Sequence, residues 1–504
     1  MPLGADHFDQ GERPCAGDGL LFRYQRREPE KTVLHAIVRS RLEPFLAAAR
    51  RTRSGRGLPS HVERELRSYL DCGILARGFA RVRCPGCGFE RLVAFSCKAS
   101  ICPSCATRRM EDIADHLCRR VFPVVPVRQW VLSLPRVLRF QAARESRVAS
   151  RLLDIFTRAV FAWQRRAARR TGVVEPRTGG VTLVQRFGGA INLNVHFHTL
   201  VPDGVFVVRG QERARFVRLP APDDEDVERI LTRVIKQVHK AFPAPEDVGG
   251  VDEDDPFAAL QAAEVDRRLR FPDPFRHARR SAHLDGFSLH AGVRVHEHDR
   301  VGLERLCRYA ARPPFALHRL TAGPEGKLVY RMKRPRGGSL FLLLTPDELL
   351  ARIATLVPPP RAHALRYHGV FAPNSRVRAQ VVPEQVADAA EPDARCPRTT
   401  STKAPATPPK TRSPDAPAPT RTRVPWAELL QKVFAVDVLA CPRCAGRLEV
   451  IAYIAEPGVA KQILDHLGLE AQAPPLAKAA ADAAADPNAG PGPAYDLVDP
   501  CYDE

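Results

Sequence analysis

Two histidines stand two residues apart in a stretch whose polar and apolar residues alternate. The stretch runs from Asn192 to Val201 and has His196 and His198 among its polar positions. Such alternation is typical of a half-buried β-strand, on which successive side chains point to opposite faces. The two imidazoles would share one face with Asn194 and lie about 6 to 7 Å apart along the strand. This pattern suits the binding of one divalent cation, and histidines that serve only packing are the competing interpretation.

A metal site on this strand would need a third ligand. The stretch 283–293 is expected to begin as a turn and to continue as a strand, and it carries several polar side chains. His290 is the candidate for the third ligand, and His283 and Asp285 are the alternatives.

One tyrosine shares a predicted helical face with two arginines. Asp299 suits the N-cap of a helix over 301–312, and two prolines follow the helix. Arg305, Tyr309 and Arg312 are spaced at i, i+4 and i+7, which is one face. A phenol beside two guanidinium groups suits nucleophilic attack on a phosphate, because the cations bind phosphate oxygens and favour the phenolate. An ordinary half-buried tyrosine with solvated arginines is the alternative.

The cysteines predict structural zinc. Cys84 and Cys87 form one C-x-x-C pair, and Cys102 and Cys105 form a second. Two such pairs match a four-thiolate zinc ribbon, since each short turn places two sulfurs on one side of a tetrahedron. Cys97 lies between the pairs and is a substitute ligand. Disulfides are the less favoured alternative.

A third C-x-x-C pair lies near the C-terminal end of the sequence. Cys441 and Cys444 supply half of a zinc site, so they are candidates for a second zinc ion. Cys396 and Cys501 stand in sequence without apolar periodicity.

The two-histidine strand must be held by neighbouring elements. A strand over 181–187 is expected to pair with it as a hairpin through Gly188 and Gly189. A further strand is expected within 121–134, and a long amphipathic helix follows from Ser150.

Composition shifts divide the chain into six segments. They are a loose lead-in (1–28), a helical and zinc-ribbon DNA-binding domain (29–120), a catalytic domain (121–376), a disordered basic linker (377–424), a small C-x-x-C module (425–470) and a disordered tail (471–504).

The charge points to a polyanionic partner. The chain of 504 residues has 77 Lys plus Arg against 57 Asp plus Glu, a formal net charge of +20. Lys and Arg supply most of the affinity of nucleic-acid binders through the phosphates. No apolar run reaches the length of a membrane span, and the first residues do not form a secretory signal.

These motifs, taken together and in order, resemble the rolling-circle transposases of the insertion-sequence-91 type, which are related to the HUH single-strand endonucleases. The likeness extends over about 30–467. The matching pieces are Cys84-x-x-Cys87, Phe95-Ser96-Cys97-Lys98, Cys102-Pro103-Ser104-Cys105, Val184-Gln185-Arg186-Phe187, Asn192 to Val201, Leu306 to Pro314, Tyr367 to Val370, and Val438 to Cys444.

The resemblance implies an α+β fold whose catalytic domain has a ferredoxin-like antiparallel sheet of the HUH type. It implies that His196 and His198 bind Mg²⁺ or Mn²⁺ and that Tyr309 attacks single-stranded DNA at transposon ends and in the target. The product would be a 5′-phosphotyrosine intermediate. Because Pro313 stands four residues after Tyr309, the chain resembles the single-tyrosine variant, which puts a two-tyrosine exchange cycle in doubt.

The resemblance also implies a cytoplasmic, nucleoid-associated bacterial protein. A rolling-circle replication initiator would share the same chemistry. A non-catalytic zinc-ribbon DNA-binding protein is the alternative from another functional class, although intact His196, His198 and Tyr309 argue against it.

Overall fold

The fold is described from a computed structural model, for residues 26–51, 55–242, 255–266, 278–336, 339–384 and 424–477. Residues 1–25 of the expected lead-in (1–28), most of the expected linker and tail, Cys396 and Cys501 lie outside the described residues.

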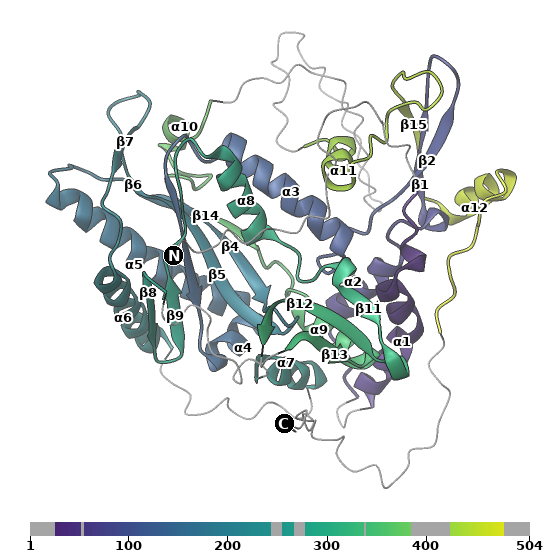
Figure 1. Ribbon diagram of the computed structural model, residues 1–504, viewed down its shortest axis with the longest axis horizontal. Helices are drawn as coiled ribbons and strands as arrows, with labels where there is room; N and C mark the ends of the chain where they lie inside the picture. The colour runs from purple at the N-terminus through teal and green to yellow at the C-terminus, as the bar shows by residue number, and fades with distance from the viewer. Residues whose placement is uncertain are drawn as a thin grey trace, which may run out of the picture.

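A seven-stranded sheet, antiparallel throughout, forms the centre of the molecule (Figure 1). Its order is β14-β4-β5-β3-β9-β8, and β10 pairs with β3 beyond β9. The strands are β3 (Val127–Ser133), β4 (Gly179–Phe187), β5 (Leu193–Pro202), β8 (Ser281–Leu284), β9 (Phe287–His290), β10 (Arg294–Val295) and β14 (Leu365–Gly369). The expected α+β class and the β4–β5 hairpin are both confirmed.

Strand β5 carries the two histidines and is buried along its whole length. The alternation indicates the two faces correctly, but the expectation of a half-buried strand is wrong because both faces are covered. Leu193, Val195 and Phe197 belong to the larger hydrophobic core. Leu200 belongs to a second core on the opposite face.

Helices cover both faces of the sheet (Figure 1). The larger core takes side chains from α1 (Val33–Arg50), α2 (Ser60–Leu70), α4 (Arg136–Arg144), α5 (Ser146–Arg170), α6 (Asp224–Ala241), α7 (Pro256–Asp266) and α9 (Pro346–Leu356). The second core lies under α3 (Pro103–Arg120) and α8 (Arg300–Ala311). No helix in the described part of the chain combines the length and the apolar character that a membrane crossing requires.

Capping side chains fix where several helices begin. Asp223 accepts a hydrogen bond from the amide of Asp226 at the start of α6, which completes a capping box. Thr345 caps α9 in the same manner. Asp299 accepts from the amide of Gly302 and so begins α8 where the sequence predicts it.

Smaller elements complete the fold. They are the sheet of β11 (Leu320–Ala322), β12 (Leu328–Arg336) and β13 (Ser339–Leu344), the pair β6 (Gly204–Val207) and β7 (Arg215–Arg218), helix α10 (Arg378–Val381), and short 3-10 turns at Pro29–Lys31, Leu75–Arg77, Leu317–Arg319 and Pro324–Gly326.

The expected linker begins too early at 377. Helix α10 lies inside that range, and Arg213 donates hydrogen bonds to the carbonyls of Ala379 and Val382. These contacts fasten the first residues of the expected linker to the folded part of the chain.

The expected C-terminal module is not a separate body. Strand β15 (Glu449–Ile454) pairs antiparallel with β1 (Phe79–Arg83), which also pairs with β2 (Glu90–Ala94). Figure 1 shows this three-stranded sheet beside α11 (Trp426–Phe434) and α12 (Pro457–His466). Segments from both ends of the sequence therefore form one structural unit.

Candidate active site and metal centres

The two histidines of β5 lie side by side on the face covered by α8. Their ring centroids are 4.9 Å apart, and both side chains are buried. Nδ1 of His196 lies 2.8 Å from the backbone carbonyl oxygen of Asn194 and can donate its proton there. With Nδ1 as the donor in this hydrogen bond, Nε2 is the nitrogen of His196 that could bind a metal ion, an orientation typical of metal-binding histidines.

The burial of His198 makes it a second candidate metal ligand. Its Nδ1 lies 2.8 Å from the side-chain amide of Gln129. If the amide oxygen faces the ring, it accepts the Nδ1 proton and Nε2 is then the nitrogen that could bind a metal ion. Nε2 of His198 is buried and has no hydrogen-bond partner among the described residues. Burial lowers the pKa of His198 well below its usual range, and nearby His196 and Arg312 lower it further. The ring is therefore neutral, as a metal ligand must be.

Tyr309 lies next to this pair. Its ring centroid is 5.7 Å from that of His198, and the two rings meet edge to face. Tyr309 is half-buried near the end of α8. The structure thus brings together the histidines and the tyrosine, although more than a hundred residues separate them in the sequence.

Gln185 fastens the end of α8 to the sheet. It lies on β4 directly opposite His196. Its Nε2 donates to the carbonyl oxygens of Tyr309 at 3.0 Å and of Ala310 at 2.7 Å. Its Oε1 is buried, and no group in the described part of the chain forms a hydrogen bond with it. This residue belongs to the stretch 184–187 that carries part of the family resemblance, but nothing in its local sequence indicates that it contacts α8.

Two cations lie against the tyrosine ring. The guanidinium of Arg312 is 4.4 Å from the ring centroid, and the ammonium of Lys333 on β12 is 5.6 Å away. Arg305, which the sequence places on the same helical face, is exposed one turn earlier on α8. The sequence does not predict the contact with Lys333, because no local pattern indicates that β12 approaches α8.

The structure does not bring His290 to the two histidines. Val131 of β3 pairs with His198 on one side and with His290 on the other. His290 is therefore two strands away, about 10 Å at the backbone. His283 lies one strand further, on β8, and Asp285 lies in the turn after it. Among the described residues, no side chain of this stretch joins His196 and His198 in a group close enough to share one ion, so the third ligand stays a prediction.

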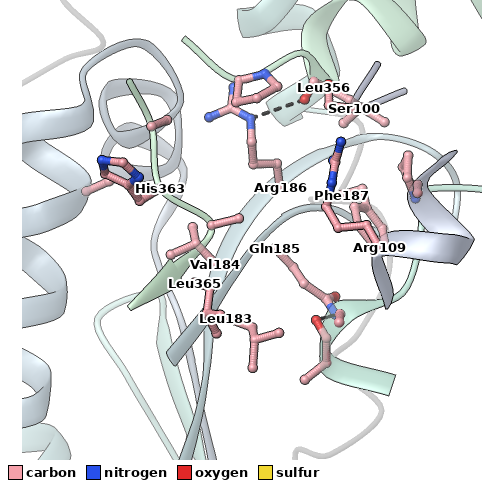
Figure 2. Close-up of a pocket in the computed structure, with 18 of the residues that line it drawn as sticks. Ser100, Arg109, Leu183, Val184, Gln185, Arg186, Phe187, Leu356, His363 and Leu365 are labelled. Carbon is pink, nitrogen blue, oxygen red and sulfur yellow. Dashed lines mark hydrogen bonds between the residues drawn. The ribbon is translucent and has the colours of Figure 1, made fainter. Parts of the chain in front are cut away.

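A cavity of about 180 Å³ adjoins this site. Figure 2 shows it along β4, with Gln185 and Arg186 on one wall and Arg109 of α3 on another. Arg312 also lines it. Burial lowers the pKa of Arg186 to about 10, which still leaves this side chain charged at neutral pH. Leucine, isoleucine, phenylalanine and proline side chains complete the lining, so the cavity combines positive charge with apolar surface.

The cysteines form two clusters that sequence spacing did not predict. One contains Cys72, Cys97, Cys102 and Cys105, and the other contains Cys84, Cys87, Cys441 and Cys444. Within each cluster the ligand atoms all lie within 4.8 Å of one another. Among the described residues, these are the groups of three or more His, Cys, Asp or Glu that could hold a metal ion. Both clusters can bind zinc, since four thiolates are a closed structural zinc site.

The predicted ligand set of Cys84, Cys87, Cys102 and Cys105 is thus divided between two sites. The reason is β2, whose five residues run from the first pair towards Cys97. Five extended residues span about 17 Å, too far for thiols at its two ends to share one ion. Cys72, at the end of α2, joins the cluster at the base of this hairpin, and Cys97 joins as the substitute that the sequence indicated.

Comparisons with known families agree with this arrangement. Residues 42–134 match the family described as "Transposase zinc-binding domain", and residues 179–379 match the family described as "Putative transposase". The first match contains the whole cluster of Cys72, and the second contains His196, His198 and Tyr309. No curated protein and no solved structure matches the chain significantly.

The order of the two matches decides the family. A zinc-binding domain precedes a transposase domain in one chain, and the described cysteine clusters fit the zinc-binding assignment. The chain therefore belongs to the insertion-sequence-91 family of transposases.

Proposed function

We propose that this transposase cuts and rejoins single-stranded DNA at the ends of an insertion sequence, through a covalent bond to Tyr309, in rolling-circle transposition. The observation that carries the proposal is the contact between the rings of Tyr309 and His198, because His198 forms a buried pair with His196. The phenolic oxygen would attack a backbone phosphorus, and the bond from phosphorus to the 3′ oxygen would break. The products are a 5′-phosphotyrosine and a free 3′-OH, and the reverse attack by a 3′-OH rejoins a strand.

The donor atoms fit a divalent cation. His196 and His198 would hold Mg²⁺ or Mn²⁺ through Nε2, and the partnerless Oε1 of Gln185 on the adjacent strand is a candidate oxygen ligand. A bound cation would supply positive charge to a phosphate oxygen and so stabilise the charge that develops in phosphoryl transfer.

The chain's own residues position the nucleophile and its substrate. Gln185 holds the last turn of α8, and the half-buried ring of Tyr309 packs against His198. Arg312 and Lys333 place positive charge beside the phenol, where the phosphate must approach. Single-stranded DNA suits the adjoining cavity, since basic and apolar surfaces together bind the backbone and unpaired bases.

Changing Tyr309→Phe is expected to abolish covalent attachment while leaving DNA binding nearly unchanged, because only the attacking oxygen is lost. The purified protein is incubated with labelled single-stranded oligonucleotides from the flanks of its own gene, with Mn²⁺ or with chelator. A labelled band at protein size on a denaturing gel reports the adduct.

Tyr367→Phe is the matched control, since Tyr367 is also half-buried on this side of the sheet and packs against His116. This variant is expected to retain the adduct. An undiminished adduct in the Tyr309→Phe protein would show that another tyrosine attacks, and Tyr330 and Tyr367 would then be tested as nucleophiles.

Changing His196→Ala is expected to remove cleavage together with the response to Mn²⁺, because a donor of the proposed cation site is lost. The same oligonucleotide assay across a range of Mn²⁺ concentrations measures this. Full cleavage by the variant would refute the metal assignment without touching the assignment of the nucleophile.

A further inference from the structure

The cluster of Cys84, Cys87, Cys441 and Cys444 joins two parts of the chain that lie far apart in sequence. We propose that these four thiolates hold a second zinc ion, which clips the C-terminal segment 424–477 onto the N-terminal zinc-binding domain. The proposal is independent of the nicking reaction. Cys441 and Cys444 lie outside both matched families, so neither match assigns this site.

The sulfur distances fit one tetrahedral ion. Sγ of Cys84 is 3.4 Å from Sγ of Cys444, and Sγ of Cys87 is 3.5 Å from Sγ of Cys441. Sulfurs bound to one zinc at about 2.3 Å would lie about 3.8 Å apart at tetrahedral angles. The two pairs therefore need only small adjustments to share an ion.

The two turns have the same backbone geometry. The amide of Cys84 donates to the carbonyl of Phe89, and the amide of Cys441 donates to the carbonyl of Gly446, each at 2.8 Å. In each turn the amide four residues after the first cysteine donates back to that cysteine's carbonyl. The residue at this fourth position has a positive φ in both turns, +74° at Gly88 and +57° at Ala445. A left-handed conformation at an alanine is uncommon, so the C-terminal turn holds this geometry against its own preference.

Contacts around the cluster hold the two segments together. Arg91 of β2 donates to the carbonyl of Val438 at 2.7 Å. A small core of their apolar side chains lies beneath the cluster. It comprises Val82, Cys84, Val93, Ala427, Val438, Cys441 and Leu448. This core has few members for a unit that must hold both ends of the chain, and small units of this kind are commonly stabilised by a structural metal.

The docked segment reaches the helix that supports the active site. Lys432 of α11 forms an ion pair with Asp115 of α3 at 2.9 Å, and the amide of Val424 donates to Asp112. One turn before Asp115 on α3, Glu111 forms an ion pair with Arg308 of α8. The proposed zinc ion would therefore fix a segment that packs on α3, and α3 in turn contacts α8, the helix that carries Tyr309.

The test is the zinc content of the full chain, purified under reducing conditions and dialysed against a competing chelator. The wild-type protein is expected to retain two zinc ions per chain, one for each cluster. The variant Cys441→Ser/Cys444→Ser is expected to retain one. Cys118→Ala, which changes a buried cysteine outside both clusters, is expected to retain two.

Amide exchange separates loss of the clip from general unfolding. In the Cys441→Ser/Cys444→Ser protein, Phe79–Arg83 and Glu449–Ile454 are expected to lose protection while β4 and β5 stay protected. Cys444→His is expected to restore the second ion that Cys444→Ser loses, since imidazole also binds zinc and this position is exposed.

Two results would overturn the proposal. One is a wild-type protein with a single zinc ion and disulfides among these four cysteines. The other is a Cys441→Ser/Cys444→Ser protein that keeps both zinc ions.

Discussion

At the scale of single residues, the uncharged side chain of Gln185 fixes the position of the end of α8. Its amide nitrogen holds the carbonyls of Tyr309 and Ala310, so the last turn of α8 is tied to the strand beside the histidines. A buried glutamine elsewhere in the fold makes a comparable pair of bonds. Gln164 of α5 donates to the carbonyls of Pro202 and Gly204. Comparing substitutions of Gln185 and Gln164 therefore distinguishes an effect on the position of Tyr309 from an effect on the stability of the fold.

Gln185→Ala is expected to slow covalent adduct formation by about 100-fold, because a small displacement of a nucleophile is costly. Its free energy of unfolding is expected to fall by about 1 to 3 kcal/mol, since two buried carbonyls lose their donor. Gln164→Ala is expected to lose similar stability and to keep its rate. Single-turnover kinetics and denaturant unfolding of both variants measure this. Equal rate losses in both would show that Gln185 acts only through stability.

At the scale of elements, a buried ion pair joins the middle strands. Arg128 of β3 donates from Nε and Nη2 to the two carboxylate oxygens of Asp203, at 2.8 and 2.6 Å, just after β5. Its Nη1 donates to the carbonyl of Ala291 beyond β9 at 2.8 Å. Arg294 also approaches Asp203, at 3.2 Å. One guanidinium thus ties three strands together at the end of the sheet.

Asp203→Asn is expected to lower the free energy of unfolding by about 3 to 5 kcal/mol, because Arg128 would remain buried without its countercharge. The exposed pair of Arg41 with Asp347 provides the comparison. Asp347→Asn is expected to cost less than about 1 kcal/mol, since solvent screens that pair. Denaturant unfolding measures both losses. Similar values would show that the buried ion pair contributes no more to the free energy of unfolding than the exposed one.

At the scale of the whole molecule, buried and half-buried histidines are expected to make the stability of the fold sensitive to acid. Burial lowers the pKa of His35 on α1, of His116 on α3 and of His368 on β14, the last to about 4. The unfolded chain binds these protons near pH 6.5 and the folded chain does so only at lower pH. Protonation therefore favours the unfolded state, and stability falls as the pH drops below about 6.5.

His368→Gln is expected to flatten this dependence by up to about 1.4 kcal/mol per pH unit between pH 6.5 and about 4, because one proton no longer binds preferentially to the unfolded chain. Urea unfolding at several pH values measures the slope. The exposed His298, changed to Gln, is the matched control. An unchanged slope in the His368→Gln protein would assign the acid sensitivity to other groups.

Local patterns determined much of this protein. Alternation located the histidine strand and its faces, and the capping residue Asp299 indicated a helix start that the structure reproduces. These features depend on side chains within a few residues of one another, so one sequence is enough to reveal them.

Tertiary structure alone decided which distant residues meet. The fold placed β3 between His290 and the two histidines, brought Lys333 to Tyr309, and divided the cysteines of the predicted ribbon between two clusters. Cys441 and Cys444 are paired with Cys84 and Cys87 only because β15 returns to β1. Pairing between strands hundreds of residues apart leaves no local signal, because the sequence of one strand does not specify which strand it pairs with.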